Sequence, residues 1–412
     1  MLYHAYEARR RLTAPVHGIA AKGSEVLHAL PEPVGSTVTL RTLRAATELV
    51  HTLRITHERP HFHIASVMID GEEVPVREER LLSTPFGTLL RFAKETDVDQ
   101  PAVLLVPGLA GHFATLIRGT VTTMLPDHDV YVLDWHNARD VPVDAGRFGL
   151  DEYIEHLIEF MQEIGPGAHL VAICQPCVAA LAAASLMAED DDPAQPQSIT
   201  LMAGPVDARV NPGPVNQFAE RRSLPHLERF VVSVPWPHAG QGRQVYPGFL
   251  QVVAFMGLDP KRHIKAFAGL FADVIKGDDA AERTKRFYAE YFAVLDVAAE
   301  FYLDTARAVF MEHHLADGRL DWRGRRVDPA AITTALLTIE GEKDELCPPG
   351  QTQAAHKLCR GIPDSRRRHR LQEGVGHYGV FSGTRFQQEI YPEIRSFIAE
   401  NAPKPAPEPA VY

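Results

Sequence analysis

The sequence predicts an α/β protein with a mainly parallel sheet, helices on both faces of that sheet, and a helical cap inserted between core strands. Two observations predict this class. Short apolar runs bounded by turn residues recur along the chain and alternate with segments of helical length. One long interval, rich in aromatic residues and mostly helical in pattern, interrupts the alternation. Strands that alternate with helices are typical of parallel sheets covered on both faces.

The predicted core strands are short runs of apolar residues. The segment 87–94 alternates in polarity, and the run 102–106 is closed by Pro107 and Gly108, which is typical of a strand that enters a loop. Similar runs lie at 130–133, 169–173, 198–202 and 335–339. Helices are predicted at 42–53, 150–164, 177–187 and, in the cap, 281–314.

These elements divide the chain into five segments. We expect an N-terminal helical elaboration, two parts of the core separated by the cap, and a disordered proline-rich tail. Their boundaries are 1–84 for the elaboration, 85–205 and 331–401 for the core, 206–330 for the cap and 402–412 for the tail.

The aromatic residues of the cap allow two interpretations. They could contact an apolar substrate, or they could form the cap's own core, which the general tendency of aromatic side chains to be buried favours. The residues in question are Phe249, Phe255, Phe267, Phe271, Tyr288, Tyr291 and Phe292.

Charge and composition exclude several functional classes. The chain has 412 residues and a formal net charge of −11, which disfavours binding to nucleic acid or to anionic lipid. The N-terminal stretch Met1 to Arg11 is polar and has no signal-peptide pattern, and no apolar run is long enough to predict a transmembrane segment. Four cysteines form no disulfide framework. We therefore expect a cytoplasmic protein.

The strongest candidate for chemistry is Cys174, directly after the run 169–173. In parallel sheets ligands bind where strands end. The frame Ala172-x-Cys174-x-Pro176 resembles the nucleophile elbow G-x-S-x-G of α/β-hydrolases, with small or helix-starting residues in place of both glycines. A cysteine at the start of a helix is favoured as a thiolate. Taken alone, such a cysteine is more often a buried apolar residue.

Two downstream residues complete a triad in the order that the α/β-hydrolase fold requires. Asp344 follows the strand 335–339, and His377 lies in a glycine-flanked loop further on. His377 would deprotonate Cys174 and later activate water, and Asp344 would fix the tautomer of the histidine. Glu340 and Glu342 compete for the role of the acid.

The loop 107–112 is the predicted second half of an oxyanion hole. The backbone N–H groups of Gln175 and Leu109 are the candidate donors, with Ala110 as the alternative. A simple tight turn or a nucleotide-binding turn would also fit this loop. The nucleotide-binding alternative is weak, because a full G-x-G-x-x-G is absent.

These motifs resemble those of the intracellular polyhydroxyalkanoate depolymerases over about residues 2–398. In that family a cysteine nucleophile is followed by Gln-Pro, and Cys174, Asp344 and His377 match the triad positions. The segments that carry the resemblance are 107–120, 125–131, 134–135, 174–176 and 374–381.

The resemblance implies a specific function. The chain would hydrolyse amorphous, granule-bound poly(3-hydroxybutyrate), or a related polyhydroxyalkanoate, to oligomers and monomer, without a metal or organic cofactor. It would act at the granule surface in the cytoplasm, and a homo-oligomer is compatible with this. Leu109 and Ala110 stand where family members often carry Met-Ser, a change that could alter the preferred chain length.

Three rival functions remain open. Cys174 and Cys177 form a C-x-x-C at a helix start, as in thiol-disulfide oxidoreductases. A polyhydroxyalkanoate synthase-like acyltransferase would use the same triad, although the glycines expected around a synthase nucleophile are missing. A granule-coating protein with a vestigial triad would bind polymer without releasing product.

The remaining polar residues of the motifs carry weaker expectations. His112, Asp134 and Trp135 are either structural or support the triad from behind. No metal site is predicted, because H-E-x-x-H is absent and the adjacent His313 and His314 face different ways on a helix.

Overall fold

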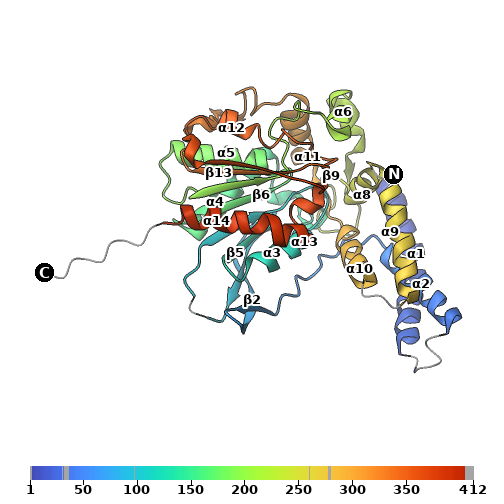
Figure 1. Cartoon of the computed structure of the whole chain (residues 1–412). Helices are drawn as coiled ribbons and strands as arrows, with labels where there is room; N and C mark the ends of the chain where they lie inside the picture. The colour runs from blue at the N-terminus through green and yellow to red at the C-terminus, as the bar shows by residue number, and fades with distance from the viewer. Residues whose placement is uncertain are drawn as a thin grey trace.

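A computed structural model describes residues 2–29, 31, 37–96, 98–258, 260–276 and 280–403. Its centre is a sheet of nine strands in the order β1-β2-β3-β5-β4-β6-β7-β13-β14 (Figure 1). From β5 to β14 neighbouring strands are parallel, whereas β1, β2 and β3 are antiparallel. The strands are β1 (Ser66–Ile69), β2 (Glu72–Ser83), β3 (Gly87–Lys94), β4 (Ala102–Val106), β5 (Asp129–Trp135), β6 (His169–Ile173), β7 (Ser198–Met202), β13 (Ala335–Gly341) and β14 (Arg367–Gln372).

Helices bury both faces of this sheet, which explains the continuous apolar runs. Along β4, Leu104 and Val106 pack in one core with α4 (Leu150–Ile164) and α5 (Cys177–Glu189). Val103 and Leu105 point the other way and pack with α3 (Arg118–Met124) and α14 (Tyr391–Asn401). Because successive side chains of a strand face opposite sides, each of these strands serves two cores. The predicted fold class is confirmed.

The cap lies between β7 and β13, as predicted, but it is less helical than expected. Its helices are α6 (Pro214–Glu220), α7 (Leu224–Leu227), α8 (Gly248–Leu258), α9 (Pro260–Lys276), α10 (Ala280–Tyr291) and α11 (Ala299–Thr305). Three short strands, β8 (Val232–Ser233), β9 (Gln244–Tyr246) and β10 (Val297–Ala298), form a small second sheet, and β11 (Asp321–Trp322) pairs with β12 (Arg325–Arg326). The helix expected over 281–314 is interrupted at 292–298, where the chain crosses to join that small sheet.

The N-terminal segment begins with two helices, α1 (Leu2–His28) and α2 (Val38–Thr52), which pack together, and α2 also packs against α9 of the cap (Figure 1). The expectation that 1–84 is helical is wrong for residues 66–83, which form β1 and β2 of the central sheet. Most of the tail predicted to be disordered, 404–412, lies outside the described residues. Among the described helices, none combines the length and apolar composition needed to cross a membrane.

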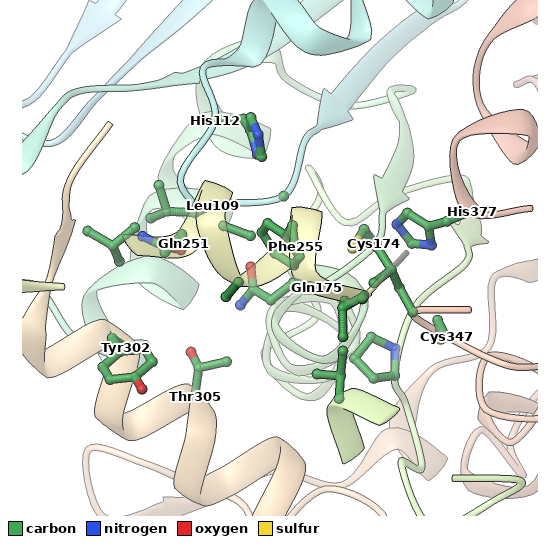
Figure 2. A pocket seen from close by; sticks show the side chains of 18 of the residues that line it. Leu109, His112, Cys174, Gln175, Gln251, Phe255, Tyr302, Thr305, Cys347 and His377 are labelled. Atoms are coloured by element: carbon green, nitrogen blue, oxygen red, sulfur yellow. The ribbon is translucent and has the colours of Figure 1, made fainter. Parts of the chain in front are cut away.

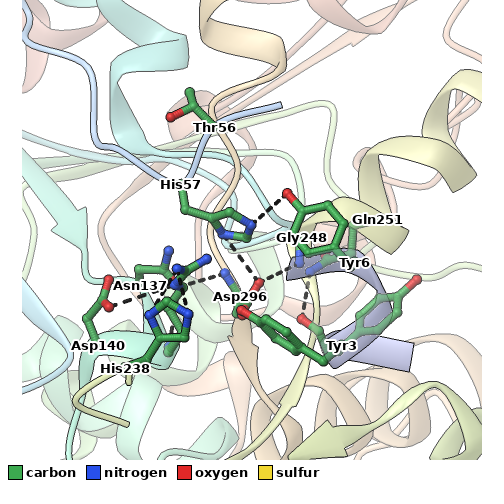
Figure 3. Close-up of polar contacts among 12 residues, drawn as sticks. Tyr3, Tyr6, Thr56, His57, Asn137, Asp140, His238, Gly248, Gln251 and Asp296 are labelled. Carbon is green, nitrogen blue, oxygen red and sulfur yellow. Dashed lines mark hydrogen bonds and ion pairs between the residues drawn. The ribbon is translucent and has the colours of Figure 1, made fainter. Parts of the chain in front are cut away.

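A buried polar network ties the start of α1 to the cap (Figure 3). The Tyr3 hydroxyl donates to Oδ2 of Asp296, and Oδ1 of Asp296 accepts from the Gly248 N–H at 2.9 Å. The Tyr6 hydroxyl lies 3.0 Å from Nε2 of His57, whose other ring nitrogen is 3.8 Å from Oδ1 of Asp296. Since Asp296 precedes β10, this network holds α1 against the strand that leads into α11.

Candidate functional site

Cys174 lies in a sharp turn between β6 and α5, at the carboxyl edge of the parallel strands. Its φ of +70° is in the left-handed region, which a non-glycine residue adopts only at an energetic cost of about 1–3 kcal/mol. The turn is held by the Cys174 N–H, which donates to the Met202 carbonyl at 2.7 Å, and by the Cys174 carbonyl, which accepts from the Cys177 N–H at 3.2 Å. The side chain is partly exposed. This is the geometry predicted for a nucleophile elbow.

The residues that replace the elbow's glycines fit the turn without strain. Ala172 is fully buried beneath the turn, and Pro176 has a φ of −62° as α5 begins. The glycine that packs closely against the turn is instead Gly204, which the sequence analysis did not predict. A Cβ on Gly204 would lie 2.1 Å from Sγ of Cys177 and 2.8 Å from the carbonyl oxygen of Cys174. A glycine directly after an apolar strand is the only sequence signal that could have indicated this contact.

The predicted acid and histidine meet at the same edge of the sheet. Nδ1 of His377 lies 2.8 Å from Oδ2 of Asp344, and both side chains are buried. The other carboxylate oxygen of Asp344 accepts from the backbone N–H groups of Leu346, at 2.9 Å, and Cys347, at 2.8 Å. The turn after β13 therefore fixes the carboxylate, and the carboxylate fixes the ring.

The two competing carboxylates have other partners. Glu340 is buried and accepts from the backbone N–H groups of Gly350, Thr352 and Gln353. Glu342 accepts from the Gly374 N–H at 2.8 Å. Both shape loops around the site, which leaves Asp344 as the partner of His377 among the three carboxylates.

The electrostatics of the site favour the protonated form of His377. Burial disfavours the charged ring of His377, but Asp344, which hydrogen-bonds to the ring, and the neighbouring Cys174 outweigh burial and raise the pKa of His377 well above the ordinary value. Burial, with Asp344 nearby, raises the pKa of the Cys347 thiol well above its ordinary value. A thiolate next to an imidazolium can attack a carbonyl carbon.

The predicted oxyanion donors flank the thiol. Gln175 and Leu109 both line the cavity above Cys174, and the Cβ position of Gly108 is 3.8 Å from Cβ of Cys174. In the described part of the chain, no acceptor takes a hydrogen bond from the N–H of Gln175, Leu109 or Ala110. Free N–H groups on two loops beside a nucleophile can stabilise an oxyanion.

A cavity of about 600 Å³ opens above Cys174 and His377, between the core and the cap (Figure 2). Its walls are apolar for the most part and include side chains of α6, α8 and α11, such as Phe218, Phe255 and Phe301. Among the described residues that line it there is no Lys or Arg. A cavity of this size fits a ligand longer than a single short acyl group.

The aromatic residues of the cap divide between the two interpretations. Phe255 lines the cavity. Phe249, Tyr288, Tyr291 and Phe292 are buried in apolar clusters, and Phe267 and Phe271 pack against such clusters.

The three residues expected to be structural or supporting are not equivalent. His112 lines the cavity and stacks on Phe255 with a centroid separation of 5.9 Å, and burial lowers its pKa to about 4. Asp134 and Trp135 do not line the cavity. Asp134 accepts from Arg59 at 2.6 Å, and the indole of Trp135 packs in the core.

Cys177 is placed unfavourably for disulfide exchange with Cys174. Its thiol is fully buried and points to the Ala172 carbonyl, with Gly204 packed against it. Burial raises the pKa of this thiol, whereas exchange requires an accessible thiolate. In the described residues there is also no cluster of three or more His, Cys, Asp or Glu side chains that could hold a metal ion.

The strand order, with Cys174 after β6, Asp344 after β13 and His377 after β14, decides the assignment of the fold. The chain has the α/β-hydrolase fold. Residues 203–402 of this α/β-hydrolase, just under half of the chain, match the family model described as PHB de-polymerase C-terminus.

Curated relatives of this α/β-hydrolase are similar over larger parts of the chain. The poly(3-hydroxyalkanoate) polymerase subunit PhaC of Allochromatium vinosum is 25% identical over 291 residues, which cover 69% of this chain and 75% of its own. The protein of the same name from Thiocystis violacea is 23% identical over 293 residues, which cover 69% and 76%. That from Haloferax mediterranei is 26% identical over 151 residues, which cover 36% and 30%.

Solved structures of lipases superpose on the chain only loosely. A monoglyceride lipase variant from Saccharomyces cerevisiae has a TM-score of 0.48 at 12% identity and covers 85% of this chain and 100% of its own. The monoacylglycerol lipase of Paleococcus ferrophilus has a TM-score of 0.43 at 14% identity and covers 74% and 97%. The fold assignment therefore rests on the strand order and on the elbow. The fold and the relatives together indicate an enzyme that handles ester bonds.

Proposed function

We propose that the chain hydrolyses the ester bonds of a poly(3-hydroxyalkanoate), such as poly(3-hydroxybutyrate), through an acyl intermediate on Cys174. The observation that carries the proposal is a strained, partly exposed cysteine that pairs with His377 and opens into an apolar cavity whose lining contains no Lys or Arg. A neutral, apolar polyester suits such a cavity better than an anionic substrate does. The match of residues 203–402 to the PHB de-polymerase C-terminus model agrees with this substrate.

The reaction would run in two acyl-transfer steps. The Cys174 thiolate attacks an ester carbonyl, and the oxyanion accepts from the N–H groups of Gln175 and Leu109. Nε2 of His377, the nitrogen that does not face Asp344, gives its proton to the departing alkoxide. The same nitrogen then takes a proton from water, which attacks the thioester and releases the acid and the thiolate.

A synthase-like acyltransferase is the second candidate, and the curated relatives favour it. Those relatives are named as polymerase subunits, and polymerisation would use the same acyl-cysteine with a chain hydroxyl in place of water as the acceptor. An acyl donor such as a coenzyme A thioester brings several phosphate charges. The described residues that line the cavity include no Lys or Arg to pair with those charges, which is why we place hydrolysis first.

One pair of assays separates the two directions. Purified chain is incubated with amorphous poly(3-hydroxybutyrate) granules or with 3-hydroxybutyryl-coenzyme A, and 3-hydroxybutyrate, soluble oligomers and free coenzyme A are measured for wild type and Cys174→Ala. Hydrolysis predicts acid and oligomers from granules that depend on Cys174. Release of coenzyme A with growth of polymer, and no product from granules, would establish the synthase direction instead.

The proposed substrate also implies a location. The chain would act in the cytoplasm at the surface of polymer granules, and co-sedimentation of Cys174→Ala with granules measures that association without turnover. Recovery of the variant in the supernatant at every granule concentration would contradict it.

A further inference from the structure

Polar side chains gather at one end of the cavity, away from the cysteine-histidine pair. Gln251, Tyr302 and Thr305 lie there, and the amide of Gln175 lies between them and the pair of Cys174 and His377 (Figure 2). The amide nitrogen of Gln251 already donates to the Tyr246 carbonyl at 3.3 Å. The cavity therefore has a reactive end and a polar end, joined by apolar walls.

Two polar atoms of the cavity lining, one at the polar end and one between that end and Cys174, are buried and make no hydrogen bond within the described residues. They are Oε1 of Gln175, in a residue 8% exposed, and Oγ1 of Thr305, in a residue 6% exposed. Thr305 is the last residue of α11, and a helical threonine commonly bonds to the carbonyl four residues before it, but Thr305 does not. Leaving such an atom unpaired costs about 1–3 kcal/mol, so a polar group of a ligand that bonds to either atom would be stabilised in the cavity.

The chemistry of the two atoms restricts that ligand. An amide oxygen needs a donor, which an ester carbonyl lacks, and a carboxylate is an acceptor that would also bring a charge into a cavity lined by no Lys or Arg. A hydroxyl group both donates and accepts. It can donate to the Gln175 oxygen or accept from the Thr305 hydroxyl, and it also fits if the amide is turned over.

We propose that Gln175 and Thr305 form a subsite for the free hydroxyl end of a polyester chain, so that the chain is cleaved from that end. The subsite rests on the proposed function. When the thiolate attacks an ester carbonyl, the C–S bond forms, the C–O bond breaks, and the proton from His377 goes to the leaving alkoxide. The acyl part that stays on Cys174 ends in the free hydroxyl, and the leaving alcohol carries the carboxyl end. An acyl part held in the cavity therefore presents its hydroxyl to the polar end.

The test compares two 3-hydroxybutyrate oligomers of equal length, one with a free hydroxyl end and one with that hydroxyl methylated. We expect wild type to hydrolyse the free oligomer with a kcat/KM at least tenfold higher. Thr305→Val keeps the shape of the side chain and should lower this preference severalfold through a higher KM for the free oligomer, and Thr305→Ser should restore it. Binding of both oligomers to Cys174→Ala, measured by calorimetry, should show the same preference without turnover.

The outcomes separate the subsite from the proposed function. Equal hydrolysis of both oligomers by wild type, dependent on Cys174, overturns the subsite and leaves the proposed function intact. An equal loss on both oligomers in Thr305→Val, or no recovery in Thr305→Ser, also overturns the subsite. No hydrolysis of either oligomer by wild type overturns the proposed function and the subsite with it.

Discussion

Replacing Asp344 by Asn tests the triad directly, because the structure fixes how the new side chain must sit. One oxygen of Asp344 accepts from two backbone N–H groups, at 2.9 and 2.8 Å, and an asparagine must keep its carbonyl oxygen there. Its NH₂ group then replaces the oxygen that lies 2.8 Å from Nδ1 of His377. A donor at that position forces Nδ1 to accept, so the ring proton moves to Nε2 and the neutral ring can no longer take the proton of Cys174.

The expected loss is large and falls on the chemical step. The corresponding Asp-to-Asn change in a serine protease triad lowers kcat about 10⁴-fold by the same tautomer switch, which is about 5 kcal/mol of transition-state stabilisation. We expect Asp344→Asn to approach this loss of kcat on p-nitrophenyl butyrate, followed as the acylation burst in stopped flow. The pKa of His377, followed by NMR of a labelled ring, should fall from its raised position because the Asp344 carboxylate is one cause of that rise.

A matched control lies two residues away. Glu342 accepts from the Gly374 N–H, and Glu342→Gln keeps that acceptor, so we expect its kcat to stay within about twofold of wild type. If Asp344→Asn keeps more than a tenth of the wild-type kcat, or if the pKa of His377 does not move, the assignment of Asp344 as the acid of the triad is refuted.

Two further predictions address the neighbouring thiol and the anchor of α1. Cys177→Ala should keep the rate of ester hydrolysis close to that of wild type, because this thiol is buried beneath the turn, where it points to the Ala172 carbonyl. A loss of activity as complete as that in Cys174→Ala would favour the oxidoreductase function. Burial raises the pKa of Asp296 to about 6, against bonds from Tyr3 and Gly248 that lower it. Because the folded protein binds this proton more tightly than the unfolded chain does, protonated Asp296 stabilises the fold at low pH. The free energy of unfolding should therefore fall by about 3 kcal/mol as the pH rises from 4 through 6. Asp296→Asn should not show this fall when the free energy of unfolding by urea is compared at pH 4 and 7. An equal fall in wild type and variant would contradict the conclusion that Asp296 causes it.

The core of the fold was predictable because the strands concerned are buried on both sides. The runs 102–106, 169–173 and 198–202 coincide with β4, β6 and β7, since a strand that serves two cores is buried on both sides and is therefore mostly apolar. By contrast β2 carries six Glu or Arg residues, lies near the antiparallel end of the sheet and is mostly exposed, so its sequence has no apolar pattern that distinguishes it from a surface helix. The helical expectation failed there for that reason.

The placement of the three predicted triad residues at one edge of the sheet could be predicted for a different reason, namely that the α/β-hydrolase fold orders such residues along the chain. Each of Cys174, Asp344 and His377 follows the end of a strand, so the strand assignment was enough to bring them to one edge. Contacts that depend on distant parts of the chain gave no such signal. Tyr3 and Asp296 are 293 residues apart, and the need for glycine at position 204 arises only when β7 is packed against the start of α5.

The contrast between the core strands and the contacts of distant segments also separates the type of reaction from the choice of substrate. The turn at Cys174 and the pair of Asp344 and His377 are built from the core, and the proposed acyl transfer through Cys174 would use them whichever acceptor follows. The cavity is closed by the cap, and it is the cap that contributes Thr305 at the polar end and the apolar walls of α6 and α8. Because the N-terminal helices hold the cap through Tyr3 and Asp296, a change in that anchor would move the walls of the cavity without touching the triad. Choice of acceptor and of chain end therefore depends on residues outside the catalytic motifs, and substitutions in the cap are the ones that would separate hydrolysis from polymerisation.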